Sequence, residues 1–295
     1  MLDRDGRAPT WLKNDRHFQR VVVGLVGTLA MTAFAVTALW NLRAQDADVR
    51  LSRILAGDAQ VSQVARVRGW LLGPPRVGLQ VGHWLAERHP EETAALRIST
   101  GGYARGVEEI DINMAVVTEL TRRLSQAGVH VDILPAVVPP DYRADVFLSI
   151  HADSSENPER RGYKSAHRQP ARNDREPLLL RAIDRAYLEA SGLPHDLANI
   201  SGGMNDYYAF ASHRLRHATA PQTPSVIVEL GYLSHPDDLA WMQDTAQTAA
   251  ALERAVLAYL SALERWAPPR GTAEDVRPNV RVLASETCLE PFLPC

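Results

Sequence analysis

Short apolar runs alternate with longer stretches of helical periodicity from residue 77 onward, and this alternation most restricts how the chain can fold. The runs at residues 77–81, 129–134, 145–150 and 225–229 have the length of β-strands. Strands that alternate with helices favour a parallel sheet with helices packed against it. We therefore predict a single α/β domain in which a mostly parallel twisted sheet is flanked by helices.

The predicted helices show apolar residues at a spacing of three or four. In the first helix, from about Glu109, apolar residues recur every four positions between Ile112 and Leu124. Gly128 follows at a position where glycine commonly ends a helix. Two further helices are predicted over residues 177–191 and 245–263.

The N-terminal region contains one long apolar segment, residues 21–40, without a charged residue or a proline. As a helix it would span roughly 30 Å, the thickness of a bilayer's hydrocarbon core. Five basic residues precede it, so the N-terminus should stay in the cytoplasm and the remainder should be exported. We predict a transmembrane anchor. A cleaved signal peptide is the alternative, and it would also export the domain.

Three predicted strands run into a strongly polar residue. These residues are His83, reached through Gly82, then His151 and Glu229. Functional groups of α/β sheets gather beyond the carboxyl ends of the strands. Glu109 begins the first predicted helix, where the helix dipole favours a carboxylate. Two imidazoles and one carboxylate are a familiar zinc ligand set, and a second carboxylate can act as general acid and base.

The residues around these positions resemble a known family. Residues 149–153, Ser-Ile-His-Ala-Asp, are similar to the Ser-Ile-His-Ala-Asn segment of the zinc-dependent N-acetylmuramoyl-L-alanine amidases. Residues 228–234 resemble that family's Val-Glu-x-Gly-Phe-Leu-Ser segment, and residues 109–114 resemble its Glu-Lys-Asp-x-Asn-Leu helix start. Gly82-His83 resembles its Gly-His pair. The segments occur in the family's order, and the resemblance covers roughly residues 77–263.

The family cleaves the amide between N-acetylmuramic acid and L-alanine in peptidoglycan. The resemblance implies that His83, Glu109 and His151 bind Zn²⁺ and that Glu229 is the general acid and base. Glu108 is an alternative to Glu109, but only Glu109 keeps register with the family's helix start. A zinc peptidase acting on stem peptides and a non-catalytic wall-binding or regulatory protein are the alternative functions.

The chain departs from the family pattern around His83. The family usually has Asp-Pro before Gly-His and two glycines after it, whereas this chain has Gln80-Val81 before and Trp84 after. Trp84 either stacks on the substrate or packs under its loop. These changes concern contacts to the substrate more than the metal site.

Other polar and aromatic residues allow two interpretations each. The aromatic residues within 204–210 either line a cleft or form a buried edge segment. Lys164 either meets a substrate carboxylate or is a solvated lysine. Whether residues 155–224 gate the site is open.

Together these features predict a membrane-anchored protein whose catalytic domain lies outside the cytoplasm. We expect a cytoplasmic segment at 1–20, an anchor at 21–40, a stalk at 41–76, an amidase-like catalytic domain at 77–266 and a tail at 267–295. The expected location is the cell membrane, with a single span and the catalytic domain outside the cytoplasm. The expected partners are peptidoglycan and the membrane. A protein activator is possible but unidentified.

The net charge and the two cysteines bear on binding partners and on the cellular compartment. The net charge of -3, without a Lys/Arg-rich face, argues against nucleic-acid binding. Cys288 and Cys295 either close a short disulfide loop in an oxidising compartment or remain free thiols.

Overall fold

The computed structural model describes residues 45–58, 62–268 and 279–284, together with positions 23, 25–28 and 31. The chain divides into two units at residue 49, and the account below concerns the second. No helix among the described residues is long and apolar enough to cross a membrane. Most of the predicted anchor and both cysteines lie outside the described residues, so those predictions stay predictions.

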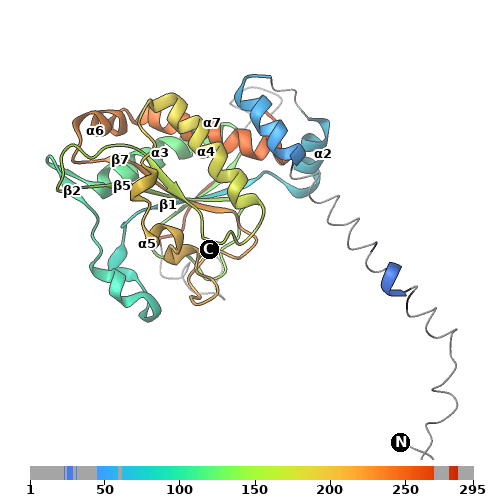
Figure 1. Ribbon diagram of the computed structural model, residues 1–295, viewed down its shortest axis with the longest axis horizontal. Coiled ribbons are helices and arrows are strands. Elements are labelled where there is room, and N and C mark those ends of the chain that lie inside the picture. The colour runs from blue at the N-terminus through green and yellow to red at the C-terminus, as the bar shows by residue number, and fades with distance from the viewer. Residues whose placement is uncertain are drawn as a thin grey trace, which may run out of the picture. The chain divides into compact units, whose positions relative to one another are not determined.

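A six-stranded sheet forms the centre of the described domain (Figure 1). Its strand order is β6-β7-β5-β1-β4-β8. Only β6 runs antiparallel to its neighbour, and the other neighbouring pairs are parallel. This confirms the predicted α/β fold with a mostly parallel sheet. The strands are β1 (Arg76–Val81), β4 (His130–Leu134), β5 (Val146–Asp153), β6 (Lys164–Ala166), β7 (Ser225–Tyr232) and β8 (Val280–Val282).

Three long helices gather on one side of the sheet (Figure 1). They are α3 (Glu109–Gln126), α4 (Arg175–Ser191) and α7 (Thr245–Ala262), close to the predicted ranges. Helix α3 packs on β1, β4 and β5, α4 packs on β7, and α7 contacts both helices. Gly128 has φ 77°, a left-handed conformation that suits glycine and ends the first helix as predicted.

The opposite face of the sheet is covered by irregular chain rich in aromatic residues. This chain includes α5 (Gly202–Asn205) and η5 (Tyr208–Phe210). Phe147 of β5 and Ile227 of β7 pack there with Phe210. Because side chains alternate along a strand, Ser149, His151 and Glu229 project to this same face.

The strands that carry His151 and Glu229 extend further than predicted. Both residues lie inside β5 and β7, because these strands continue to pair beyond the apolar runs. His151 pairs with Glu229 and Asp153 pairs with Tyr232, with a register shift between the two pairs. The site therefore rests on a continuous pair of strands rather than on two loops.

Three elements lie where the sequence pattern is weak. Strand β8 falls in the predicted tail, and α2 (Gln63–Leu72) falls in the predicted stalk. The third is helix α6 (Pro236–Gln243), which begins shortly after the end of β7. The remaining described elements are η2 (Ala86–Arg88), η3 (Glu91–Ile98), β2 (Tyr103–Ala104), β3 (Val107–Glu108) and η4 (Leu197–Asn199).

Candidate metal centre and active site

His83 lies in a sharp turn directly after β1. Its backbone has φ 63°, a left-handed conformation that is uncommon for residues other than glycine. Its Nδ1 lies 2.9 Å from the carbonyl oxygen of Ser99, which can only accept a hydrogen bond. Nδ1 is therefore the donor, and Nε2 is directed toward Glu109, 3.3 Å from its Oε2.

Glu109 is the first residue of α3, and its side chain is buried. Its Oε2 accepts a hydrogen bond from the backbone N–H of Gly102 at 2.8 Å. Its Oε1 accepts one from the side chain of Asn113 at 3.2 Å. Glu108, the sequence alternative, is exposed at the residue before the helix. The structure thus directs Glu109, and not Glu108, toward the two histidines.

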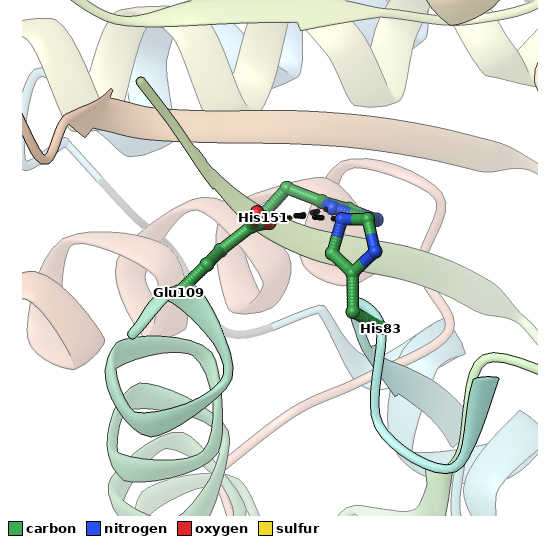
Figure 2. A group of neighbouring side chains, drawn as sticks. All are labelled: His83, Glu109 and His151. Atoms are coloured by element: carbon green, nitrogen blue, oxygen red, sulfur yellow. Dashed lines mark hydrogen bonds and ion pairs between the residues drawn. The ribbon is translucent and has the colours of Figure 1, made fainter. Parts of the chain in front are cut away.

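His151 projects from β5 against the turn that carries His83. A side chain at Gly82 would come within 2.5 Å of the His151 ring, so a glycine is required for this close approach. The Nδ1 atom of His151 lies 2.9 Å from Oε1 of Glu109. Figure 2 shows His83 and His151 pointing at the same carboxylate from the β1 turn and from β5.

These three residues form a group that could hold a metal ion. One ligand atom from each of His83, Glu109 and His151 lies within 4.8 Å of the others. Two imidazole nitrogens and one carboxylate oxygen suit zinc and related divalent metals. Three protein ligands leave a coordination position open for water or substrate, as catalytic sites require. The residues present therefore fit a metal ion.

The charges of the three side chains are coupled. Burial alone would raise the pKa of Glu109, but hydrogen bonds from His151 and His83 lower it well below its usual range. Burial alone would lower the pKa of His83, but its interactions with Glu109 and Ser99 raise it above the ordinary value. The carboxylate is thus held in its charged form, the form that binds a cation.

Glu229 lies beside this group on β7. Its strand register pairs it with His151 on one side and with Lys164 on the other. Burial, Glu109 and Asp153 raise the pKa of Glu229 well above its ordinary value, and Lys164 opposes this shift. A carboxyl group with a raised pKa is suited to giving up and taking back a proton near neutral pH.

Lys164 is a buried residue, so its interpretation as a solvated lysine is wrong. It forms an ion pair with Asp153, and its ammonium group lies 5.0 Å from the centre of the Tyr232 ring. The other interpretation, contact with a substrate carboxylate, is not needed to explain it, because Asp153 already neutralises the ammonium group. Lys164 therefore serves as an internal cation next to Glu229.

Two cavities meet at the candidate site. The larger, about 820 Å³, lies between η3 and residues 201–215. The smaller, about 430 Å³, lies between residues 98–102 and 152–154. His83, His151 and Glu229 line both cavities. The candidate reactive groups are therefore accessible from two sides.

The walls of the larger cavity are joined by Glu92 of η3. Its carboxylate accepts hydrogen bonds from the backbone N–H groups of Arg216 and His217 at 2.9 and 2.7 Å. Tyr207 and Tyr208 also line this cavity, whereas Phe210 is buried in a core cluster, so the aromatic segment both borders a cleft and forms part of the core. Trp84 is not among the residues that line either cavity.

Sequence reasoning missed two polar residues beneath His151, namely Gln80 and Tyr207. The hydroxyl of Tyr207 lies 2.9 Å from Nε2 of His151 and 3.1 Å from Oε1 of Gln80. The departure from the family pattern at Gln80 and the aromatic residues within 204–210 were separate signals, but neither indicated that Gln80 and Tyr207 meet.

Comparisons with known proteins give matches among solved structures. No curated protein matches the chain. Among solved structures, the catalytic domain of the amidase CwlV from Bacillus (Paenibacillus) polymyxa var. colistinus is 20% identical, with TM-score 0.44, covering 64% of this chain and 99% of that one. The amidase Ami1 from Mycobacterium smegmatis is 21% identical, with TM-score 0.47, covering 63% and 97%. The CwlD amidase from Clostridioides difficile, in complex with the GerS lipoprotein, is 16% identical, with TM-score 0.44, covering 63% and 98%.

A family model gives the assignment. The model described as N-acetylmuramoyl-L-alanine amidase matches residues 79–258, more than half of the 295 residues. The matched range contains all four residues at the candidate site. The chain therefore belongs to the N-acetylmuramoyl-L-alanine amidase family and to that class of enzyme.

Proposed function

We propose that the protein hydrolyses the amide between N-acetylmuramic acid and L-alanine in peptidoglycan, and that it depends on zinc. The observation that carries this proposal is the convergence of His83, Glu109 and His151 within 4.8 Å, beside Glu229 on the neighbouring strand. In this role the first three residues would hold zinc. When bound, zinc would lower the pKa of water and polarise the scissile carbonyl.

Glu229 would carry the proton in this reaction. Its carboxylate takes a proton from the attacking water and gives it to the leaving nitrogen, so the products are a lactyl carboxylate and a free alanine amine. Lys164 keeps a positive charge next to the carboxylate and so opposes the rise in the pKa of Glu229. Glu109 remains ionised throughout, since its two histidine partners hold its pKa low.

The two cavities support a substrate that extends on both sides of the cleaved bond. The amide of peptidoglycan joins a bulky sugar to a peptide, so neither side of the reactive centre can be closed. The junction of the cavities at His83, His151 and Glu229 offers that arrangement. We place the amide at this junction, with the sugar and the peptide in separate cavities.

The activity is tested with purified protein and isolated sacculi. We expect release of stem peptides with new alanine amino groups, lost with a chelator and restored by zinc. Glu229→Gln should lower the rate by about 10²–10⁴-fold and still bind zinc, because the carboxylate supplies proton transfer only. His151→Ala should lose the metal.

The matched control is Glu108→Gln, which removes the exposed carboxylate next to Glu109. It should keep both activity and zinc. New reducing sugar ends in place of alanine amines would contradict amidase activity, and cleavage within the stem peptide would favour the peptidase alternative.

We also propose that residues 21–40 anchor the protein, with the catalytic domain outside the cytoplasm. Support comes from the uncharged apolar run and the five basic residues before it. The full chain should remain in the membrane fraction after an alkaline carbonate wash, and protease added to spheroplasts should digest the domain. A soluble product shortened at its N-terminus would show a cleaved signal peptide instead.

A further inference from the structure

The outer nitrogen of His151 contacts a tyrosine rather than water or a carboxylate. Nδ1 faces Glu109, whereas Nε2 lies 2.9 Å from the hydroxyl of Tyr207. His151 is 6% exposed and Tyr207 is 9% exposed. Their contact is therefore shielded from solvent, and the groups that can act on it belong to the protein.

The next side chain in this network is Gln80, which contacts the Tyr207 hydroxyl. The amide Nε2 of Gln80 lies 2.6 Å from the carbonyl oxygen of Ala136, and a carbonyl can only accept. This contact fixes which end of the Gln80 amide is nitrogen. Its Oε1 therefore faces the hydroxyls of Ser149 and Tyr207, at 2.6 and 3.1 Å.

The hydroxyl of Tyr207 has one proton, and Oε1 of Gln80 can only accept it. When a metal ion takes the lone pair of Nδ1 of His151, the ring proton lies on Nε2, and the Tyr207 hydroxyl, 2.9 Å away, can accept it while it donates its own proton to Gln80. We infer that Gln80 and Tyr207 form a relay that, in the metal-loaded protein, holds the proton of His151 on Nε2 and so leaves the lone pair of Nδ1 for the metal. This inference rests on the proposed metal site.

The two histidines of the site are thus oriented by different means. His83 donates its outer N–H to the backbone carbonyl of Ser99, which any residue could supply. His151 depends on two side chains, and one of them, Gln80, stands where the family usually has aspartate. Gln80 and Tyr207 are positioning residues, since they act on the metal through His151.

Zinc affinity tests the relay directly. Competition with a chromogenic chelator should show about 10–100-fold weaker zinc binding in Tyr207→Phe, the usual cost of losing a partner of a ligating histidine. Gln80→Leu should weaken binding in the same direction, because the Tyr207 hydroxyl is then free to donate toward Nε2. Circular dichroism of each variant confirms that it is folded.

Tyr208→Phe is the matched control. Tyr208 neighbours Tyr207, lines the same cavity and donates to the same Ala136 carbonyl at 2.7 Å. The Tyr208 hydroxyl also lies 3.2 Å from the Tyr207 hydroxyl and from Nε2 of Gln80. In this variant Gln80 keeps its bond to the Ala136 carbonyl, and its Oε1 remains the acceptor for the Tyr207 hydroxyl. Zinc affinity should therefore equal that of the wild type. A loss equal to that of Tyr207→Phe would overturn the relay.

A second measurement uses the wild-type protein alone. Nitrogen NMR of zinc-loaded protein with ¹⁵N-labelled histidine should show Nδ1 of His151 bound to metal and a slowly exchanging proton on Nε2. Metal on Nε2 would overturn the inference, as would unchanged zinc affinity in folded Tyr207→Phe. Failure of the wild type to bind zinc would instead overturn the proposed metal site.

Discussion

Two neighbouring carboxyl groups of the site have opposite pKa shifts. Hydrogen bonds from two histidines hold the pKa of Glu109 low, although burial opposes this. Burial and nearby carboxylates raise the pKa of Glu229. Pairs of carboxyl groups whose environments separate their pKa values commonly divide the roles of an active site. Here the low-pKa group suits a cation ligand and the high-pKa group suits proton transfer.

The raised pKa of Glu229 predicts a pH effect on stability. In metal-free protein, the unfolded chain releases the Glu229 proton near pH 4.5, whereas the folded chain keeps it to higher pH. The contribution of Glu229 to the stability of the wild type therefore falls as pH rises above about 4.5. Metal-free Glu229→Gln lacks this loss, so its stability relative to wild type should increase from pH 4.5 to pH 8.

Urea unfolding with a chelator present, at several pH values, measures this difference. Glu108→Gln serves as the control, since it removes an exposed carboxylate beside the same site. A constant stability difference between Glu229→Gln and the wild type across the pH range would show that the folded-state pKa of Glu229 is not raised.

At the scale of elements, a buried ion pair fastens the aromatic segment to the sheet. The side chain of Arg172, 4% exposed, pairs with Glu176 in the first turn of α4, which is fully buried. The guanidinium also donates to the carbonyl oxygens of Phe210, Thr219 and Thr223. Arg172 thus binds the chain between η5 and β7, which follows the relay tyrosine, at several points.

Removing this side chain should be costly. Arg172→Met leaves the carboxylate of Glu176 buried without its partner, and we expect a loss of about 3–5 kcal/mol in the free energy of unfolding. Chemical denaturation measures it. The exposed neighbour Arg175→Met is the control, and it should change stability little. Recovery in the double variant Arg172→Met/Glu176→Met would attribute the loss to the unpaired charge, whereas a loss equal to that of the control would contradict it.

The sequence pattern predicted the central strands of the sheet but not the two edge strands, β6 and β8, and the difference has a physical reason. Strands β1, β4, β5 and β7 are apolar runs, because both faces of each are covered. Strands β6 and β8 have three residues each, and they form through pairing with β7 and β4 rather than through local preference. A short segment whose partner is distant in sequence leaves little periodicity to detect.

For the candidate site too, the sequence indicated some residues and could not indicate others. The positions of His151 and Glu229 next to apolar runs were visible in the sequence, and family register separated Glu109 from Glu108. The contact between Gln80 and Tyr207 joins residues 127 positions apart, so no local pattern could reveal it. It depends on how the aromatic segment folds over the sheet.

At the scale of the whole molecule, the candidate metal site connects separate parts of the domain. His83 follows β1, Glu109 begins α3 and His151 lies in β5. In the unfolded chain these ligands are dispersed over 69 residues, from 83 to 151. A metal that binds the three residues together must therefore favour the folded state.

Zinc should accordingly raise the melting temperature. At a free concentration 100 times its Kd, a ligand that binds only the folded state adds about 2.7 kcal/mol. For a domain of this size that corresponds to a rise of about 5–10 °C. Calorimetry with and without zinc should show this rise in the wild type and in Glu229→Gln, which keeps all three ligands. His151→Ala should show none, and an equal rise in that variant would place the zinc elsewhere on the molecule.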